Sequence, residues 1–560
     1  MARRAARQVT PADDLPVARV AVDVSLAHLD RPFDYLVPQR LAAAAVPGCR
    51  VRVRFAGQLT GGYLLARLAA SDHPGRLAYL ERVVSPEPVL RPEIAALARE
   101  VADRYAGTLA DVLRLAIPPR HAAAEAAPAG PAGAGPADGG GGGRPPAPAP
   151  GPWARYPAGP AFLAALADGR APRAVWTALP GPDWPAEIAL AAAATAASGR
   201  GTLIVLPDAR DLGRTDQALA SVLGPGSHAC LAAGLGPAER YRRWLTVSRG
   251  QVRVVAGTRA AMFAPVHDLG LVVIWDDGDD LHAEPRAPYP HAREVLALRA
   301  HRAGAAALIG GFARTAEATS LVSSGWAAAL AAARPQVRAS APKISAAGAD
   351  TELTRDSEAR SARIPGLALR TARAGLARGP VLVQVPRRGY VTAVACENCR
   401  ASARCAVCGG PLALATGTGP AGGEVIVVAE ASLPVVQALI RWDPAAHAER
   451  ELAERYTLRF PPAVRMAAVS GPERAVAALL AAADLPPDAE VLGPVTQEGA
   501  AAPAGNGAGQ APADTVRMLV RMPRSGASAL AGALQAAQAV RSARKDAGPV
   551  RVQLDPAELI

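Results

Sequence analysis

Four cysteines in the second half of the chain have the residue type and spacing of a metal site. Cys396, Cys399, Cys405 and Cys408 form two Cys-x-x-Cys pairs with five residues between them. Each pair can present two thiolates to one tetrahedral cation, so paired pairs are typical of zinc sites. Buried or redox-active thiols are the alternative. Because all four ligands would be sulfur, the pattern predicts a structural zinc, not a catalytic one.

A second group of residues bears on nucleotide chemistry. Residues 251–280 contain two apolar runs, VRVVAG and LVVIW, and the second run is followed by four acids around a glycine. In parallel α/β sheets, ligands bind at the carboxyl ends of the strands. An ATPase keeps its magnesium-binding carboxylate there. The position that should carry this carboxylate is Trp275, and an indole cannot bind a metal.

In a nucleotide-binding α/β domain, the phosphate-binding loop follows the first strand. At the corresponding place in this chain the sequence is ALPGPDWPAEI, which does not suit phosphate binding. A P-loop needs glycine amides that face the phosphates, a lysine for their charge and a Ser or Thr for Mg²⁺. This loop has only Gly181, no lysine, and three prolines that lack an N–H group (Pro180, Pro182 and Pro185). We therefore expect no ATP binding.

Basic and aromatic residues near the N-terminus suggest a nucleic-acid site. Arg50, Arg52 and Arg54 alternate along one strand-like run, and Phe33 and Tyr35 lie in a neighbouring segment. Cations that hold phosphates beside rings that stack on bases are typical of single-strand binding. An ordinary solvated strand face is an equal alternative.

The elements that must position these residues fit an α/β fold. Five apolar runs, VWTAL, TLIVLP, VRVVAG, LVVIW and AALIGG, alternate with helical patterns between about residues 153 and 335. This alternation predicts a doubly wound parallel sheet. Residues 17–121 instead read as short alternating strands closed by two helices, and residues 460–560 as a small α+β domain with an alanine-rich helix.

The bulk composition favours a polyanionic partner. The net charge is +12, and Arg greatly outnumbers Lys. Arg suits bidentate phosphate contacts, although a GC-rich coding sequence would also raise the Arg content. The basic N-terminus lacks the apolar segment of a signal peptide, and no run is long and apolar enough to span a bilayer. We expect a cytoplasmic protein that binds nucleic acid and no membrane.

Several motifs in order along the chain resemble the PriA (primosomal protein N′) family of bacterial replication-restart helicases. They are GTRAAMFAP at 257–265, LGLVVIWDDGDD, RRGYVTAVACENC and FPPAVRMAAV, together with RPFDYLVP and GCRVRVRF near the N-terminus. The resemblance covers most of the chain. It implies that Phe33, Asp34 and Tyr35 form the family's pocket for the 3′ end of a nascent DNA strand.

The same resemblance supplies domain boundaries for a multidomain α/β chain with degenerate RecA-like lobes. The predicted divisions are a disordered leader (1–16), a 3′-end-binding domain (17–121), a Pro/Gly/Ala linker (122–152), lobe 1 (153–335), a shortened lobe 2 with the cysteine-rich segment 396–408 (336–459) and a C-terminal domain (460–560).

Departures from the family pattern fall on the ATP-handling motifs. Trp184 and Pro185 stand where the family's GxTGSGKT loop has Lys and Thr, and residues 275–278 read WDDG where the family has DEEH. The second lobe's GTQMLAKG and QVAGRAGR motifs have no counterpart. The family uses eight cysteines for two zincs, so the four here would hold at most one.

These observations predict a family member that lacks helicase activity and does not hydrolyse ATP. It would bind stalled or branched forks, 3′ ends and single strands, and would support replisome reloading with other primosome proteins. One alternative is an active ATP-dependent 3′–5′ DNA helicase. Another is a basic DNA-binding scaffold outside replication, which would show no preference for forks with a free 3′ end.

Overall fold

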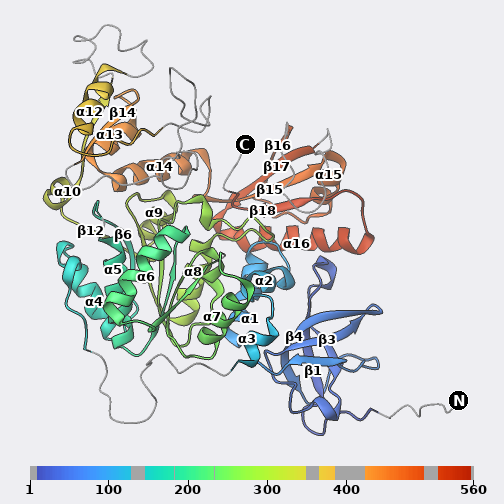
Figure 1. Ribbon diagram of the computed structural model, residues 1–560. Helices are drawn as coiled ribbons and strands as arrows, with labels where there is room; N and C mark the ends of the chain where they lie inside the picture. The colour runs from blue at the N-terminus through green and yellow to red at the C-terminus, as the bar shows by residue number, and fades with distance from the viewer. Residues whose placement is uncertain are drawn as a thin grey trace, which may run out of the picture. The chain divides into compact units, whose positions relative to one another are not determined.

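The computed structural model describes residues 9–127, 146–181, 183–232, 234–347, 365–384, 423–496 and 515–556. They form two compact units. The first unit contains Met1–Thr177, Pro185–Ala331 and Ala448–Ile560, and the second contains Ala178–Trp184 and Ala332–His447. Three of the four sheets belong to the first unit (Figure 1).

The N-terminal part of the first unit is a five-stranded antiparallel sheet in the order β2-β1-β4-β3-β5. One face of this sheet forms a small core that includes Ala18, Val20, Val51 and Leu64. The strands are β1 (Val17–Val22), β2 (Phe33–Leu36), β3 (Arg50–Phe55), β4 (Gln58–Leu68) and β5 (Arg82–Ser85).

Helices α1 (Pro92–Arg104) and α2 (Leu109–Ala116) follow this sheet, as the apolar spacing predicts. Proline at the first position of α1 is favourable because its missing N–H would have no helical partner. The Thr108 side chain caps α2 by accepting a hydrogen bond from the Asp111 amide at 3.2 Å. The next residues, the first of the stretch assigned to the linker, form the short helix α3 (Ala122–Ala126).

A seven-stranded parallel sheet forms the middle of the first unit, in the order β12-β6-β11-β10-β7-β9-β8 (Figure 1). Its strands are β6 (Arg173–Thr177), β7 (Gly201–Val205), β8 (His228–Leu231), β9 (Val254–Gly257), β10 (Leu269–Trp275), β11 (Ala306–Gly311) and β12 (Ala328–Ala331). The helices around it are α4 (Gly159–Ala167), α5 (Trp184–Ala197), α6 (Ala209–Leu223), α7 (Pro237–Ser248), α8 (Ala292–Ala303) and α9 (Ala316–Ser323).

This sheet confirms the predicted α/β fold. Every residue of β10 is buried, as expected for a central parallel strand that is covered on both faces. Two further strands, β8 and β12, were not predicted. Strand β8 is the short run HACL and β12 is AALA, so neither carries the β-branched residues that mark the other strands.

The C-terminal part of the first unit is an antiparallel sheet in the order β16-β17-β15-β18, as the α+β prediction required. Its elements are β15 (Val464–Pro472), α15 (Glu473–Ala482), β16 (Glu490–Thr496), β17 (Thr515–Pro523), α16 (Ala527–Arg544) and β18 (Arg551–Leu554). Among the helices that the structure describes, none has the length and apolarity needed to cross a membrane.

The second unit is built on two parallel strands, β13 (Lys343–Ala347) and β14 (Glu424–Val428). Its helices are α10 (Arg334–Ser340), α12 (Gly366–Leu376) and α13 (Pro434–Arg441), and α14 (Pro444–Leu458) leads from it into the first unit.

Candidate nucleic-acid interface and nucleotide site

Strand β2 presents the Phe-Asp-Tyr sequence to both faces of the N-terminal sheet. Neighbouring residues of a strand point to opposite faces, so Phe33 and Tyr35 share one face and Asp34 lies on the other. Tyr35 is buried in the core of the sheet, and its hydroxyl donates to the Arg54 carbonyl at 3.4 Å. Phe33 is half-buried, with its ring edge to face against Phe55 at 4.8 Å. Of the two rings, Phe33 is the more accessible to a base.

Asp34 is held by a two-pronged ion pair. Arg19 donates from Nε to one carboxylate oxygen at 3.0 Å and from Nη2 to the other at 3.1 Å. The Ser71 hydroxyl adds a third hydrogen bond at 2.7 Å. The hydrogen bond from Arg19 is the main cause that lowers the pKa of this carboxyl, against the opposing effect of its burial. Asp34 is therefore an ionised, oriented hydrogen-bond acceptor at neutral pH.

The three arginines of strand β3 point away from the core, as the alternation predicts, while the intervening valines are buried. Arg50 is the most anchored of the three. Its Nη1 donates to the Tyr63 hydroxyl at 2.8 Å and its Nη2 donates to the Pro118 carbonyl at 2.6 Å. The guanidinium also lies over the Tyr63 ring. Arg50 thus ties the sheet to the end of α2 and has little freedom to contact phosphate.

Arg52 and Arg54 are both exposed. Arg54 forms an ion pair with Glu81 at 2.7 Å, so part of its charge is already neutralised. Among the described residues, the Arg52 side chain makes one long hydrogen bond, 3.5 Å from Nη1 to the Leu59 carbonyl. Of the three predicted arginines, Arg52 is therefore the best placed to bind a phosphate.

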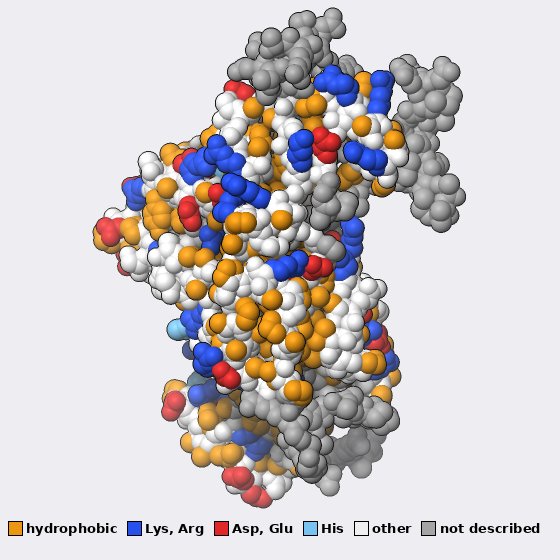
Figure 2. Space-filling model, turned by 90° about the vertical axis from the view of Figure 1, so that its left-hand side faces the viewer, with side chains coloured by type: hydrophobic (Ala, Val, Ile, Leu, Met, Phe, Trp, Pro, Cys, Tyr) orange, Lys and Arg blue, Asp and Glu red, His pale blue; other side chains and the backbone are white. Residues whose placement is uncertain are grey.

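Basic side chains also occur elsewhere on the surface. On the face drawn in Figure 2, the Lys and Arg side chains of the described residues are scattered among hydrophobic and acidic ones, without a continuous stripe. On this face the described residues therefore show no continuous basic path for a DNA backbone.

The loop that follows β6 occupies the place of a phosphate-binding loop. Leu179 and Pro180 are buried, and Gly181 has a positive φ of 145°. Helix α5 then begins at Trp184, whose side chain is buried. Proline has no N–H group to offer to a phosphate, and a buried indole replaces the lysine that a P-loop needs.

A row of aromatic rings lies at the carboxyl ends of the central strands. The ring centroids of Trp153 and Trp176 are 5.1 Å apart, those of Trp176 and Trp275 are 5.4 Å apart, and those of Trp275 and Phe312 are 5.2 Å apart. Gly310 of β11 pairs with Trp176 on one side and with Trp275 on the other. A Cβ atom at Gly310 would approach Trp176 to 2.4 Å. The glycine thus lets the two indoles meet across the middle strand.

The acids that follow β10 are committed to internal contacts or to one another. Asp277 is buried, and its Oδ2 accepts hydrogen bonds from Arg293 Nη1 at 2.9 Å and from the Thr315 hydroxyl at 2.7 Å. Burial, with the neighbouring Asp279 as the next cause, raises the pKa of Asp276 to about 6. A carboxylate that is neutralised by a buried arginine is not available to a magnesium ion.

The predicted zinc ligands Cys396, Cys399, Cys405 and Cys408 lie outside the described residues. Within the described residues, a different group of metal-ligating side chains comes together: Asp216, His228 and Cys230. This group was not predicted from the sequence. The alternation of His228 and Cys230 on a short apolar run is the only signal for it, because the third member comes from the preceding helix.

Comparison with known proteins gives matches at both ends of the chain. Residues 19–118 match the family described as 3'DNA-binding domain (3'BD), and residues 456–557 match the Primosomal protein N C-terminal domain. Over 95% of its length the chain is 44% identical to proteins of Mycobacterium bovis and Mycobacterium tuberculosis named "Probable replication restart protein PriA", of which the alignments cover 99%. The Mycobacterium leprae protein of the same name is 42% identical.

These alignments also show that the chain lacks internal segments that its relatives have. The alignment with the Mycobacterium bovis protein extends over 674 positions but contains 95% of the 560 residues of this chain. More than one hundred positions of that protein therefore have no counterpart here. Because almost the whole of both chains is covered, the missing positions are internal.

Fold and site together define a multidomain protein with a RecA-like parallel-sheet lobe and a 3′ DNA-binding domain. The relatives named above, which align with this chain over nearly its full length, all belong to one group of proteins. The chain belongs to the family of the replication restart protein PriA.

Proposed function

We propose that this chain binds branched DNA forks that carry a free 3′ end and supports replisome reloading there without turning over ATP. Its partners would be DNA and other primosome and replisome-loading proteins. The observation that carries the proposal is the aromatic row at the strand ends where a nucleotide motor would bind its triphosphate.

Three features support the absence of ATP turnover. The loop after β6 has no lysine, Trp275 stands in place of the magnesium carboxylate, and Asp277 is paired with Arg293. Phosphoryl transfer depends almost entirely on positioned charges, and removing one preorganised charge or donor typically costs 10²–10³-fold in rate. With all of these groups missing, the chain would hydrolyse ATP no faster than the uncatalysed background rate.

The N-terminal domain supports the DNA-end assignment. Asp34 is an oriented, ionised acceptor that can take a hydrogen bond from a hydroxyl group, and a 3′ end is where a DNA strand presents one. Phe33 precedes it on β2, and its half-buried ring on the opposite face of the strand is the aromatic residue we assign to a terminal base. Arg52 adds an exposed cation for the backbone.

The first experiment measures ATP hydrolysis by the purified chain, with and without fork DNA. We expect no stimulation by DNA and no unwinding of a labelled strand. A nucleotide-binding titration on the same sample should show no saturable binding. DNA-stimulated hydrolysis above the rate of a protein-free control would favour the active helicase instead.

The second experiment separates fork recognition from general DNA affinity. Phe33→Ala and Asp34→Asn are compared on a fork with a 3′-hydroxyl, on the same fork with a 3′-phosphate and on a blunt duplex whose 3′ ends also carry phosphate. We expect each variant to weaken binding to the 3′-hydroxyl fork about tenfold more than binding to duplex. For Asp34→Asn the reason is a lost hydrogen bond to a charged group, about 1.5–3 kcal/mol, and for Phe33→Ala it is lost stacking on a base, about 1–3 kcal/mol. Asp168→Asn, an exposed carboxylate of the parallel-sheet lobe, is the control. Equal losses on all three DNAs would reject the assignment.

A further inference from the structure

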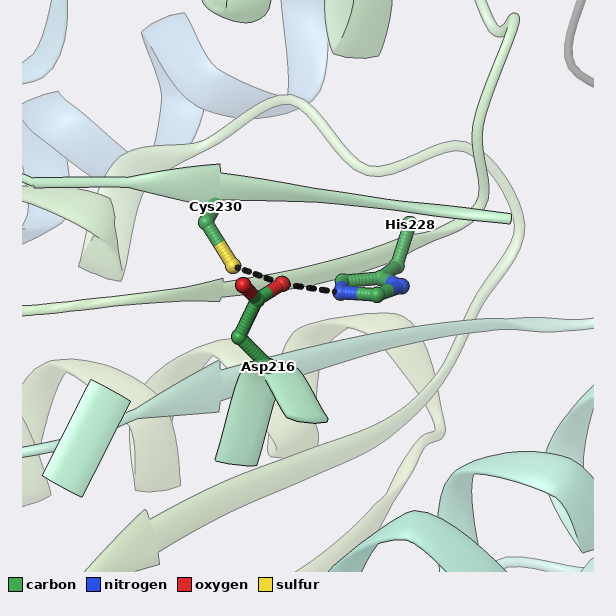
Figure 3. Close-up of side chains that lie close together, drawn as sticks. All are labelled: Asp216, His228 and Cys230. Atoms are coloured by element: carbon green, nitrogen blue, oxygen red, sulfur yellow. Dashed lines mark hydrogen bonds and ion pairs between the residues drawn. The ribbon is translucent and has the colours of Figure 1, made fainter. Parts of the chain in front are cut away.

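Three side chains with metal-ligating atoms converge at the edge of the seven-stranded sheet (Figure 3). Asp216 comes from helix α6, and His228 and Cys230 come from strand β8. Because they are two residues apart on one strand, His228 and Cys230 point to the same side of the sheet. Strand β8 is last in the sheet order, so this group lies near solvent at the sheet edge.

The three ligand atoms lie close to one another. His228 Nε2 is 2.7 Å from Asp216 Oδ1, and the Cys230 thiol donates to the same oxygen at 3.2 Å. All three ligand atoms are within 4.8 Å of one another. The carboxylate therefore stands between the imidazole and the thiol, and Figure 3 shows both side chains directed toward it.

The contacts of Cys230 do not suit a cysteine that acts as a nucleophile. An activated cysteine needs a base or a cation that draws off its proton, but Cys230 contacts a carboxylate and not the imidazole. Burial, and then the hydrogen bond with Asp216, raise the pKa of this thiol to about 12. A disulfide is also unavailable among the described cysteines, because Cys49 is buried in the core of the N-terminal sheet.

We propose that Asp216, His228 and Cys230 bind one zinc ion, with water as the fourth ligand. Carboxylate, imidazole and thiolate are the three donor types that zinc takes in proteins. Zinc binding would displace the proton of the Cys230 thiol to solvent, as metal binding to a thiol requires. The resulting thiolate, the carboxylate and the neutral imidazole then balance the charge of a divalent cation.

Zinc bonds of about 2.0–2.3 Å in a tetrahedron put ligand atoms roughly 3.3–3.8 Å apart. The carboxylate oxygen must therefore move away from the imidazole by less than about 1 Å. The imidazole and the thiol, whose ligand atoms lie within 4.8 Å of each other, must approach by at most about 1.5 Å.

The surroundings permit this change. Asp216 is exposed, with 53% of its side chain accessible, so it can rotate and a metal ion can enter from solvent. His228 Nδ1 has no hydrogen-bond partner among the described residues, so a proton placed there breaks no bond and leaves the Nε2 lone pair to the metal. The nearby cation Arg243 is paired with Glu239 at 2.7 Å, which limits its repulsion of the metal ion.

A bound zinc would fasten strand β8 to helix α6. The two elements are linked in sequence only by the turn at residues 224–227, and β8 has a neighbouring strand on one side only. A ligand that binds the folded state but not the unfolded state stabilises the fold in proportion to the logarithm of its concentration. Zinc binding would therefore stabilise the parallel-sheet lobe, whether or not a nucleotide is bound.

The test uses the full chain with Cys396, Cys399, Cys405 and Cys408 all replaced by serine, so that the second possible zinc set is removed from every sample. Zinc is titrated in, and bound metal is counted by mass spectrometry of the intact protein. We expect one zinc per chain. Asp216→Asn and His228→Ala should each weaken zinc binding at least tenfold, because even indirect partners of a metal site contribute 10–100-fold to affinity.

A cobalt titration identifies the sulfur ligand. The serine background should show a thiolate-to-cobalt charge-transfer band, and Cys230→Ser should abolish it. Asp168→Asn and His301→Ala, both exposed on the same lobe, are the matched controls and should leave both readouts unchanged. Asp216 is a surface residue of a helix, so its Asn variant should fold. Absence of zinc binding in the serine background, or zinc binding that Asp216→Asn leaves unaltered, would overturn the proposal.

Discussion

The indole rings of Trp176 and Trp275 meet across strand β11, with their centroids 5.4 Å apart and Gly310 between them. Gly310 lies opposite Trp176 on one neighbouring strand and opposite Trp275 on the other. Because glycine has no side chain, the two indole rings can meet across it. Aromatic pairs at this distance contribute about 0.5–1.5 kcal/mol beyond their burial. The absence of a side chain at Gly310 is therefore part of how the strand ends are held together.

Gly310→Ala should destabilise the parallel-sheet lobe. The added Cβ would lie 2.4 Å from Trp176 Cε3, and the ring cannot yield easily because Trp153 packs against it. Overpacking of this kind costs about 1–3 kcal/mol, measurable by urea unfolding. Gly213→Ala is the control, since nothing lies within 4 Å of its added Cβ in α6, and it should be neutral or slightly stabilising. Equal stability of both variants would contradict the packing argument.

Asp277→Ala should be strongly destabilising, because it removes the nearer carboxylate partner of the buried Arg293 guanidinium and leaves it the longer, 3.7 Å ion pair with Glu294. Removing one partner of a buried ion pair typically costs about 3–5 kcal/mol. Asp168→Ala removes an exposed carboxylate from a surface ion pair, and should cost less than about 1 kcal/mol. A small effect for Asp277→Ala would mean that this carboxylate is not needed for folding and could serve another purpose.

Asp276→Asn should change how stability depends on pH. The carboxyl has a pKa of about 6 in the folded chain against 3.8 when exposed. Between these values the folded state keeps a proton that the unfolded state has released, so this contribution to stability is present below about pH 4 and is lost as the pH rises through 6. The asparagine variant lacks this loss.

We therefore expect Asp276→Asn to exceed the wild type in stability by about 1–3 kcal/mol above pH 7. Asparagine also tolerates the left-handed backbone at this position, where φ is 53°. Unfolding by urea at pH 4.5 and at pH 7.5 measures the difference. A stability gain of the same size at both pH values would show that the carboxyl does not titrate in this range.

Arg52→Ala should weaken binding to all DNAs by a similar factor. An exposed guanidinium that contacts one phosphate releases about one counterion, so the slope of log affinity against log salt should fall by about 1. Arg170→Ala, an exposed arginine on the parallel-sheet lobe, is the control. If the salt slope of Arg52→Ala equals that of the wild type, the arginine face of β3 is only a solvated surface.

The sequence was sufficient to predict much of the fold. Buried β-branched runs followed by helical patterns predicted the parallel sheet, and alternation predicted that Arg50, Arg52 and Arg54 share an outward face. Strands β8 and β12 escaped prediction because His, Cys and Ala carry little strand signal in such short runs. Their strand character comes from pairing with β9 and β6, which no local pattern encodes.

The details of the sites depended on contacts between distant residues. The sequence placed Asp34 in a candidate pocket, but its partner Arg19 lies 15 residues away and is brought opposite by the register of β1 and β2. Likewise, the acid cluster after β10 was visible, but only the packing of α8 places Arg293 against Asp277. Which carboxylates are neutralised is therefore a tertiary property.

The row of rings also limits what one substitution at the strand ends can change. A lysine placed at Trp184 would leave Trp176, Trp275 and Phe312 packed together at the strand ends. Charged phosphates brought against buried indoles would lose hydration without gaining partners. Shrinking one ring alone would open a cavity in the lobe. A nucleotide site at these strand ends would therefore need several coordinated substitutions, because each one alone has a cost in packing or hydration.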